Sequence, residues 1–268
     1  MSAVSLPMYD LPEVRPALDA WWAGLARHLA REGVSEVPAA LPHGAPLDAA
    51  WSRRDLLLSQ CCGYDLLNGY AGDLRPLATP CYGAPGCVGP TYASIVIVAA
   101  GAPAASLDDL RGGVCAINGW TSHSGMNALR ALIAPRSRGG RFFARIAVSG
   151  SHRASLAMVA RGEADVAAID CVVHALLARH RPGALTGTRP LGYTAPAPAP
   201  PFVTRASARD ATVERLRAAL FRAFDDPSLE AARADLLLAG IEVLPLAVYA
   251  RIRAFERLAA GRGYPVLA

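Results

Sequence analysis

The sequence predicts an α/β protein with two lobes. Three times in the middle of the chain a short apolar run is followed by a helical pattern, which is typical of a mostly parallel sheet with helices on both faces. The chain has 268 residues, 53% of them hydrophobic, and this is enough for two domains with cores of their own. Three helical patterns close the chain without strands of their own, so we expect them to pack on the first lobe.

Four elements are predicted before these repeats. They are a short strand over 3–9, an amphipathic helix over 16–31, a buried strand over 55–61 and a strand over 92–99. The helix is predicted from apolar residues at helical spacing, and the strands from short apolar runs rich in β-branched residues or followed by glycine.

The three strand-helix repeats follow in order. Their strands are predicted over 114–118, 143–148 and 164–169, and their helices over 124–134, 151–161 and 171–180. In the first of these helices Met126, Leu129 and Ile133 fall on one side, as packing on a sheet requires.

The last third of the chain is predicted from its prolines and its helical patterns. Prolines exclude a helix over 190–204, which we expect to run extended. The closing helices are predicted over 209–224, 228–239 and 246–260. We therefore assign 1–92 and 205–268 to lobe one and 93–204 to lobe two, with a ligand cleft between the lobes.

The basic residues exclude several functions. The Lys+Arg count of 27 consists of arginine alone, so the chain has no lysine for Schiff-base, pyridoxal or Walker-type phosphate chemistry. The net charge of +5 comes from scattered arginines, the densest group being Arg136, Arg138 and Arg141 in a Gly/Ser-containing loop. No basic stripe with interleaved aromatic residues is present, so we expect no binding of nucleic acid.

The cysteines predict neither a metal site nor a cofactor. The six of them are Cys61, Cys62, Cys81, Cys87, Cys115 and Cys171, and none has zinc-ligand spacing. Cys81 and Cys87 flank a Gly/Pro turn and could pair in an oxidising compartment, although the adjacent Cys61 and Cys62 argue against a disulfide framework.

The N-terminal residues do not follow the pattern of a secretory signal, since Asp10 and Glu13 come soon after Pro7. We expect a cytoplasmic protein as the sequence stands, or a periplasmic one whose leader has been removed. The uncharged stretch 76–107 is interrupted by prolines and glycines, so we expect no membrane insertion.

Two hydroxyl-rich turns with a histidine follow the first two strands of the repeats. One contains Ser122, His123 and Ser124, and the other contains Ser151 and His152. A strand that leads into a helix in this way directs free N–H groups and the positive end of the helix dipole at one spot, which favours an anion. Two such turns predict a binding site.

Each of these residues also has a structural interpretation. Ser124, Ser151 and Asp170 precede or begin helices, so they could serve as caps. His152 would be neutral if buried, although a bound anion would favour its charged form. Gln60 and Tyr64 follow a strand at the expected rim of the cleft and could close over the ligand.

Four motifs occur in an order that points to a known family. They are Leu107-Asp108-Asp109-Leu110-Arg111-Gly112, Ser122-His123-Ser124-Gly125, Ser149-Gly150-Ser151-His152 and Gly162-Glu163-Ala164-Asp165-Val166-Ala167-Ala168-Ile169-Asp170. From about 56 to 203 the chain thus resembles the phosphate, phosphite and phosphonate substrate-binding proteins of ABC transporters, which have the type II periplasmic-binding-protein fold.

The resemblance implies roles for individual residues. The family holds a tetrahedral phosphorus oxyanion with the hydroxyls of a Ser-Thr-Ser-Gly turn, a histidine, an aspartate and tyrosines of the first lobe. These roles correspond here to Ser122, Ser124, His152, Asp170 and Tyr92, with Tyr64 as a weaker candidate. His123 stands where the family has a threonine.

We therefore expect a non-enzymatic solute-binding protein that closes on a small oxyanion and serves an ABC transporter permease or a regulator. The alternative is a cytosolic enzyme on the same fold, similar to the menaquinone-pathway enzymes and acting on a small carboxylate. No set of nucleophile, base and orienting group is recognisable in the sequence, which favours binding over catalysis.

Overall fold

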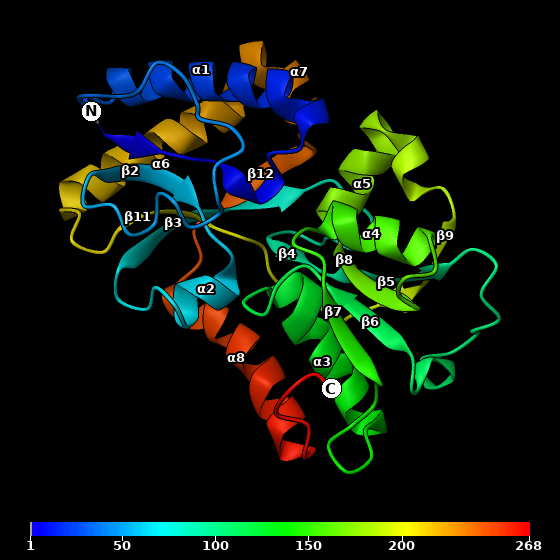
Figure 1. Ribbon diagram of the computed structural model, residues 1–268. Coiled ribbons are helices and arrows are strands. Elements are labelled where there is room, and N and C mark those ends of the chain that lie inside the picture. The colour runs from blue at the N-terminus through cyan, green and yellow to red at the C-terminus, as the bar shows by residue number, and fades with distance from the viewer. Residues whose placement is uncertain (1) are drawn as a thin grey trace. The chain divides into compact units, whose positions relative to one another are not determined.

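The computed structural model describes residues 2–268, which fold into two compact units. Unit 1 consists of the residues up to Gly83, Val88–Pro90 and Pro198–Val248, and unit 2 consists of Ala84–Cys87, Thr91–Ala197 and Tyr249–Ala268. Each unit is thus built from segments that lie far apart in the sequence, as the colours of Figure 1 show.

Unit 1 combines a five-stranded sheet with helices. Its strands are β1 (Ala3–Val4), β2 (Leu56–Gln60), β3 (Leu74–Tyr82), β11 (Phe202–Arg205) and β12 (Leu238–Glu242). Its helices are α1 (Arg15–Arg31), α2 (Gly63–Leu67), α6 (Asp210–Asp225) and α7 (Glu230–Asp235), with 3-10 turns at Pro7–Tyr9, Pro12–Val14 and Pro227–Leu229.

The sheet of unit 1 is mixed rather than mostly parallel. Its strand order is β1-β2-β11-β3-β12. β1 runs parallel to β2, whereas β11 is antiparallel to β2 and β3, and β12 is antiparallel to β3. The direction changes because β11 belongs to the segment that returns from unit 2 and inserts between two strands of the first segment.

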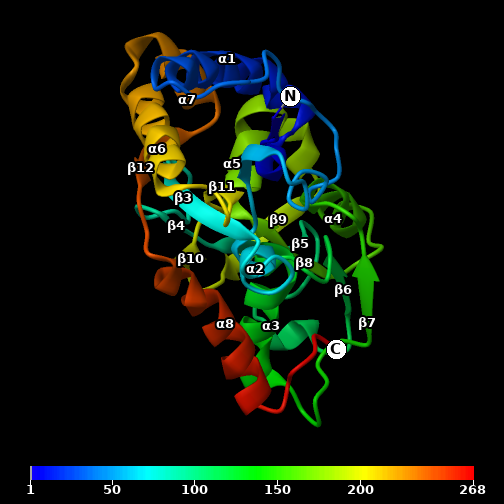
Figure 2. The same ribbon diagram turned by 90° about the vertical axis from the view of Figure 1, so that its left-hand side faces the viewer.

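Helices α1, α6 and α7 lie together over this sheet (Figures 1 and 2). Trp21 of α1 meets Phe224 of α6 edge to face, with the ring centroids 4.9 Å apart. Gly24 lets α1 approach Leu229 closely, because a Cβ at this position would lie 2.3 Å from the Leu229 side chain. The helix predicted over 16–31 is therefore present and buries its apolar side as expected.

Two strands of unit 1 were not predicted. β3 carries Pro76 and Pro80, yet the strand pairs on both sides. β12 begins within the last two residues of the segment predicted as a helix over 228–239, and the rest of that segment forms a 3-10 turn and the short α7. Pairing with β3 outweighs the helical pattern of this segment, because tertiary context overrides local propensity.

Unit 2 contains the three strand-helix repeats. Its strands are β5 (Ser94–Ala99), β6 (Val114–Ile117), β7 (Arg145–Val148), β8 (Val166–Asp170) and β9 (Thr188–Tyr193), and the short strands β4 (Thr91–Tyr92) and β10 (Ala197–Pro198) lie where the chain passes between the units. Its helices are a π-helical turn (His123–Asn127) that continues into α3 (Ala128–Ile133), then α4 (His152–Ala160), α5 (Cys171–His180) and most of α8 (Leu246–Gly261), with 3-10 turns at Asp108–Leu110, Ala134–Arg136 and Pro182–Leu185.

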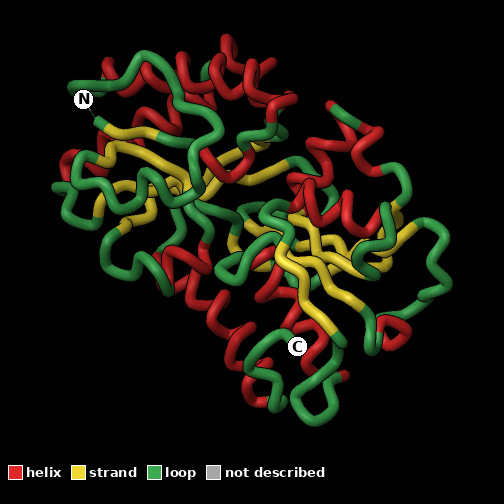
Figure 3. The backbone as a smooth tube through the Cα atoms, viewed as in Figure 1, coloured by secondary structure: helices red, strands yellow, loops and turns green. Residues whose placement is uncertain are grey.

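The sheet of unit 2 has the order β7-β6-β8-β5-β9. β6 is parallel to β7 and β8, as the repeats predict, and β5 is antiparallel to β8 and β9. Right-handed crossovers place α3 on one face and α4 and α5 on the other, an arrangement that Figure 1 shows. Figure 3 marks the strands of both sheets in yellow. The α/β class with helices on both faces is confirmed for this unit.

Helix α8 differs from the expected division, which places 205–268 in lobe one. From Tyr249 onward the chain belongs to unit 2, where Tyr249 and Ile252 are completely buried. Asn127 Nδ2 donates a hydrogen bond to the Ile252 carbonyl over 3.1 Å. The apolar side of α8 thus completes the core beside α3, a contact that periodicity along α8 alone does not reveal.

None of the helices within residues 2–268 has the length and hydropathy needed to cross a membrane. The uncharged stretch 76–107 contains most of β3, together with β4, β5 and turns.

Candidate ligand-binding site

Three strand-to-helix junctions of unit 2 share one edge of its sheet. They are the first junction (residues 118–127, after β6), the second junction (149–152, after β7) and the third junction (170–171, after β8). Because these strands are parallel neighbours, their carboxyl ends meet. Ile117 pairs with Val148, and Ser149 N donates to the Ile117 carbonyl over 2.8 Å. This is the edge at which α/β sheets bind ligands.

The first junction is a tight π-helical turn. The Ser122 side chain accepts a hydrogen bond from Gly125 N over 3.0 Å, and Asn127 N donates to the Ser122 carbonyl over 3.1 Å. Gly125 has no room for a side chain, because a Cβ would lie 1.8 Å from Asn118 Oδ1 and 3.3 Å from His152 Cε1. The glycine therefore lets Asn118 and His152 come close to the turn.

Ser124 and His152 join the first and second junctions. Ser124 Oγ and His152 Nε2 lie 2.9 Å apart, at hydrogen-bond distance. The Ser124 carbonyl accepts a hydrogen bond from Ser94 Oγ over 2.8 Å, so the first residue of β5 holds the turn in place. Two residues that the sequence predicts as ligand contacts are thus in direct contact with each other.

His152 is neutral at physiological pH. Desolvation of the imidazole by the surrounding protein is the largest cause, and it lowers the pKa of His152 to about 4, while the Ala168 carbonyl acts in the opposite direction. A neutral imidazole carries one N–H and one acceptor nitrogen. The tautomer sets the direction of the Ser124–His152 hydrogen bond. With the proton on Nε2, His152 donates to Ser124 Oγ and the Ser124 O–H can donate to an anion; with the proton on Nδ1, Nε2 accepts the Ser124 O–H instead.

Asp170 caps α5 at the third junction. Its Oδ1 accepts hydrogen bonds from Val172 N over 2.8 Å and Val173 N over 3.4 Å, and the residue is buried. In the sheet register Asp170 stands opposite Ser94. Asp170 therefore serves as a helix cap, which was its structural interpretation. Its carboxylate also lies at the edge of the sheet where the other two junctions lie.

His123 turns into the core of unit 2. Only 2% of its surface is exposed, and burial lowers its pKa to about 3. Asn127 Nδ2 lies 3.1 Å from His123 Nδ1, which must accept because the amide nitrogen can only donate. Phe255 packs edge to face on the imidazole with ring centroids 5.0 Å apart, and the Tyr92 ring lies at 6.1 Å. These contacts favour a packing role for His123.

Tyr92 shares this environment, because it is buried beside His123 in β4. The resemblance implies Tyr92 as a ligand contact, and the structure places it beside the first junction.

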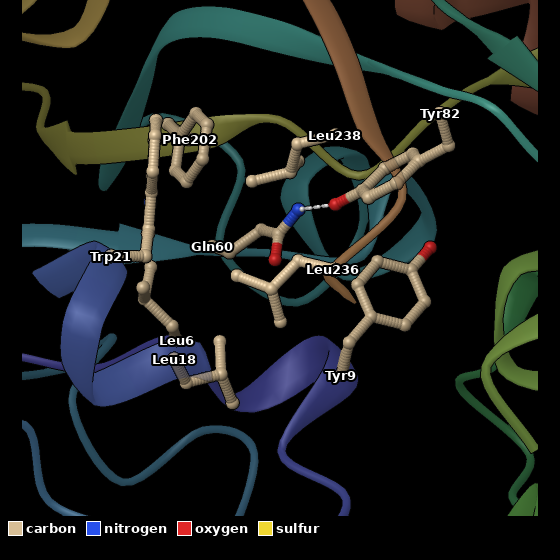
Figure 4. A pocket seen from close by; sticks show the side chains of 9 residues that line it. All are labelled: Leu6, Tyr9, Leu18, Trp21, Gln60, Tyr82, Phe202, Leu236 and Leu238. Carbon is tan, nitrogen blue, oxygen red and sulfur yellow. Dashed lines mark hydrogen bonds between the residues drawn. The ribbon is translucent and has the colours of Figure 1, made fainter. Parts of the chain in front are cut away.

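Gln60 and Tyr64 belong to unit 1. Figure 4 shows the Gln60 side chain among the residues that line a small cavity of about 20 Å³. Gln60 Nε2 donates to Tyr82 Oη over 2.9 Å and to the Pro200 carbonyl over 3.0 Å. Both amide hydrogens are thus engaged within unit 1. Tyr64 is half-buried in α2.

The structure adds two polar side chains to the set that the sequence predicts, Ser94 and Asn118. Ser94 could be found only from the antiparallel register of β5 and β8, which local patterns do not determine. Asn118 directly follows β6, and the closeness of its side chain to Gly125 depends on the π-helical turn. Among residues 2–268 no group of three or more histidine, cysteine, aspartate or glutamate side chains is arranged to hold a metal ion.

Comparisons with known proteins bear on the whole chain. A family model described as the periplasmic phosphonate substrate-binding protein of ABC transporters matches residues 57–245. No protein with a curated description matches the chain by sequence.

Several solved structures share the fold. PhnD1 from Prochlorococcus marinus in complex with methylphosphonate is 14% identical, with a TM-score of 0.77 over 95% of this chain and 96% of that one. A binding protein component of an ABC phosphonate transporter from Pseudomonas aeruginosa is 17% identical, with a TM-score of 0.75 over 97% and 86%. A Xanthomonas citri protein bound to chloride ion is 19% identical, with a TM-score of 0.71 over 98% and 97%. At these identities the likeness shows the fold.

Proposed function

This chain belongs to the family of periplasmic substrate-binding proteins of phosphonate ABC transporters, and we propose that its own ligand is a small phosphorus oxyanion: phosphate, phosphite or a phosphonate. The family match confirms the resemblance inferred from the four motifs. It also makes the chain a binding protein rather than an enzyme, so the menaquinone-type alternative is not retained.

The observation that carries this proposal is the contact of 2.9 Å between Ser124 Oγ and His152 Nε2. It brings the N-terminus of α4 beside the π-helical turn, so hydroxyl and backbone N–H donors are directed at one small region. Such donors suit the oxygens of a tetrahedral anion. The bound methylphosphonate of the Prochlorococcus protein supports the same ligand class for this fold.

Asp170 narrows the ligand further. A buried carboxylate repels an anion unless a proton or an ammonium group lies between them. Monoprotonated phosphate and monoprotonated phosphonates carry such a proton, and aminoalkylphosphonates carry an ammonium group. Sulfate at neutral pH carries neither, so we expect this protein to reject it.

The protein with its bound ligand serves uptake through an ABC transporter, or sensing through a regulator. The periplasmic character of the family supports a periplasmic location and a transporter permease as the partner.

Calorimetric titration of the purified protein with phosphate, phosphite, methylphosphonate, 2-aminoethylphosphonate, sulfate and small carboxylates tests this proposal. We expect saturable binding of at least one phosphorus compound and none of sulfate. Ser124→Ala should weaken that binding about 10- to 100-fold, because a hydrogen bond to a charged group contributes about 1.5–3 kcal/mol.

Ser137→Ala is the matched control, because Ser137 Oγ also donates a hydrogen bond within unit 2, to the Ala134 carbonyl over 2.9 Å. Its affinity should equal that of the wild type. A response to carboxylates with silence across the phosphorus compounds would overturn the ligand assignment.

A further inference from the structure

Two cysteines of unit 2 that are distant in sequence lie side by side. Cys87 Sγ and Cys171 Sγ are 3.4 Å apart although their positions differ by 84 residues. The sequence suggested that Cys81 could pair with Cys87. In the structure Cys81 Sγ instead lies 3.7 Å from Glu242 Oε1. A disulfide bond would require the two sulfurs of Cys87 and Cys171 to approach by about 1.4 Å.

The backbone around Cys87 is already docked on Cys171. Cys87 N donates to the Ala84 carbonyl over 3.0 Å, which closes a turn. Gly86 in this turn has a φ of +97°, and a Cβ there would lie 3.2 Å from Cys171 Cβ. Only a glycine allows this conformation and this close approach. The turn therefore holds Cys87 against the first residue of α5.

The two thiols differ in accessibility and in acidity. Cys87 is partly exposed, whereas Cys171 is completely buried. The hydrogen bond between the thiols lowers the pKa of Cys87 and raises that of Cys171, because it stabilises a thiolate at Cys87. This division suits an accessible attacking thiolate with a buried second thiol.

We propose that Cys87 and Cys171 are a redox modification site, at which a reversible disulfide ties the crossover segment 84–87 to the N-terminus of α5. The oxidant is a disulfide compound, either a small one such as oxidised glutathione or a disulfide oxidoreductase. Disulfides persist in the periplasm.

The exchange proceeds in two balanced steps. The Cys87 thiolate attacks one sulfur of the oxidant, so a mixed disulfide forms and one thiolate leaves. The leaving thiolate takes the proton of the Cys171 thiol. Cys171 Sγ then attacks Cys87 Sγ and releases the second half of the oxidant, which takes up a proton from solvent. Overall, two protein thiols and one disulfide give the protein disulfide and two small thiols.

The placement has a structural consequence. Unit 2 includes 84–87, but the residues on both sides of this segment belong to unit 1. The disulfide would anchor the crossover to the helix that Asp170 caps. Because the cross-link closes a long loop, the oxidised protein should melt about 5–10 °C above the reduced one.

Peptide mapping after oxidation with glutathione disulfide tests the proposal on the full chain. Tryptic cleavage after arginine places Cys171 alone in the peptide 162–179. Cys87 shares its peptide with Cys61, Cys62 and Cys81, because the Arg75–Pro76 bond resists cleavage. We expect the 162–179 peptide to be disulfide-linked in the wild type and in Cys81→Ser, and unlinked in Cys87→Ser. Dithiothreitol should reverse both the link and the rise in melting temperature.

The partly exposed Cys87 is the better site for the decisive variant, because replacing the buried Cys171 can disturb folding. If the oxidised wild type yields the 162–179 peptide with a free thiol, the proposal is overturned. A link that survives in Cys87→Ser would also overturn it, because Cys171 would then have another partner.

Discussion

The first and second junctions of unit 2 each hold a histidine, and the two imidazoles lie in different surroundings. His123 accepts a hydrogen bond from Asn127 and packs between aromatic rings, so it lies inside the unit. His152 contacts Ser124 at the edge where three strands end. The pKa is lowered in both, to about 3 and about 4.

The difference teaches that a strongly lowered pKa does not identify a ligand-binding histidine. Desolvation is the first cause in both cases. The hydrogen-bond partner distinguishes them: a core amide at His123, and at His152 the hydroxyl of Ser124 at the edge where the strands end. We therefore expect His123 to matter for stability and His152 for ligand affinity.

The largest effect is expected where the two junctions touch. Gly125→Ala places a Cβ against Asn118 Oδ1 and His152 Cε1, so both side chains must move. We expect a loss of about 3 kcal/mol in the free energy of unfolding and of more than about 100-fold in ligand affinity. Denaturant unfolding and calorimetry measure the two effects. Gly119→Ala, where a Cβ meets nothing within 4 Å, should change neither by more than a small amount.

The packing role of His123 is tested by His123→Ala. Removing a buried ring and leaving the Asn127 amide without this acceptor should lower the free energy of unfolding by about 2–3 kcal/mol. Ligand affinity measured well below the melting temperature should stay within about threefold of the wild type. A stable variant that has lost the ligand would reverse the roles of the two histidines.

His152→Ala should show the opposite pattern. We expect affinity for a phosphorus oxyanion to fall about 10- to 100-fold, because one hydrogen-bond partner of Ser124 is lost. His174→Ala is a suitable control, since His174 is half-buried in α5 of the same unit. Equal affinities for both variants would remove His152 from the binding site.

The pH dependence of stability follows from the lowered pKa values of His123 and His152. Between pH 6.5 and about 4 the unfolded chain binds more protons than the folded one at His123 and His152, so stability falls as the pH is lowered through this range. At pH 5 the loss should be about 1–2 kcal/mol for each histidine. In thermal melts the melting temperature should fall less steeply with decreasing pH in His123→Phe than in the wild type. It should also fall less steeply in the ligand-bound wild type, because an anion raises the pKa of His152.

The smallest effect concerns the choice of anion at the third junction. Asp170→Asn keeps a helix-capping side chain but removes the negative charge, so stability should change little. Affinity for phosphorus ligands should fall about tenfold. The ratio of the affinity for sulfate to the affinity for phosphorus ligands should rise. Titration with phosphate, methylphosphonate and sulfate measures the preference. An unchanged preference would leave Asp170 as a helix cap only.

Several parts of the molecule could be predicted because their signals are local. The three strand-helix repeats, the amphipathic α1 and the capping positions of Ser151 and Asp170 all follow from short-range periodicity and capping preference. At the first junction the cap is Ser122, not Ser124 as the sequence suggested. The parallel pairing of β6 with β7 and β8 follows from the repeats. The family was recognisable because three of its four motifs lie in these junctions or lead into them.

Other parts depend on contacts between distant residues. β3 forms despite its two prolines, and β12 forms at the end of a segment with a helical pattern, because the two strands pair with each other. The placement of α8 also depends on distant contacts, because from Tyr249 onward this helix completes the core of unit 2 rather than unit 1.

The site shows the same division. Residue types and their spacing indicated an anion site, because a strand followed by a capped helix directs N–H groups outward whatever surrounds it. They did not distinguish His123 from His152, place Ser94 opposite Asp170, or bring Cys87 to Cys171. These relations arise when segments dozens of residues apart are packed together, and the free energy that determines them comes from burial and register rather than from local propensity.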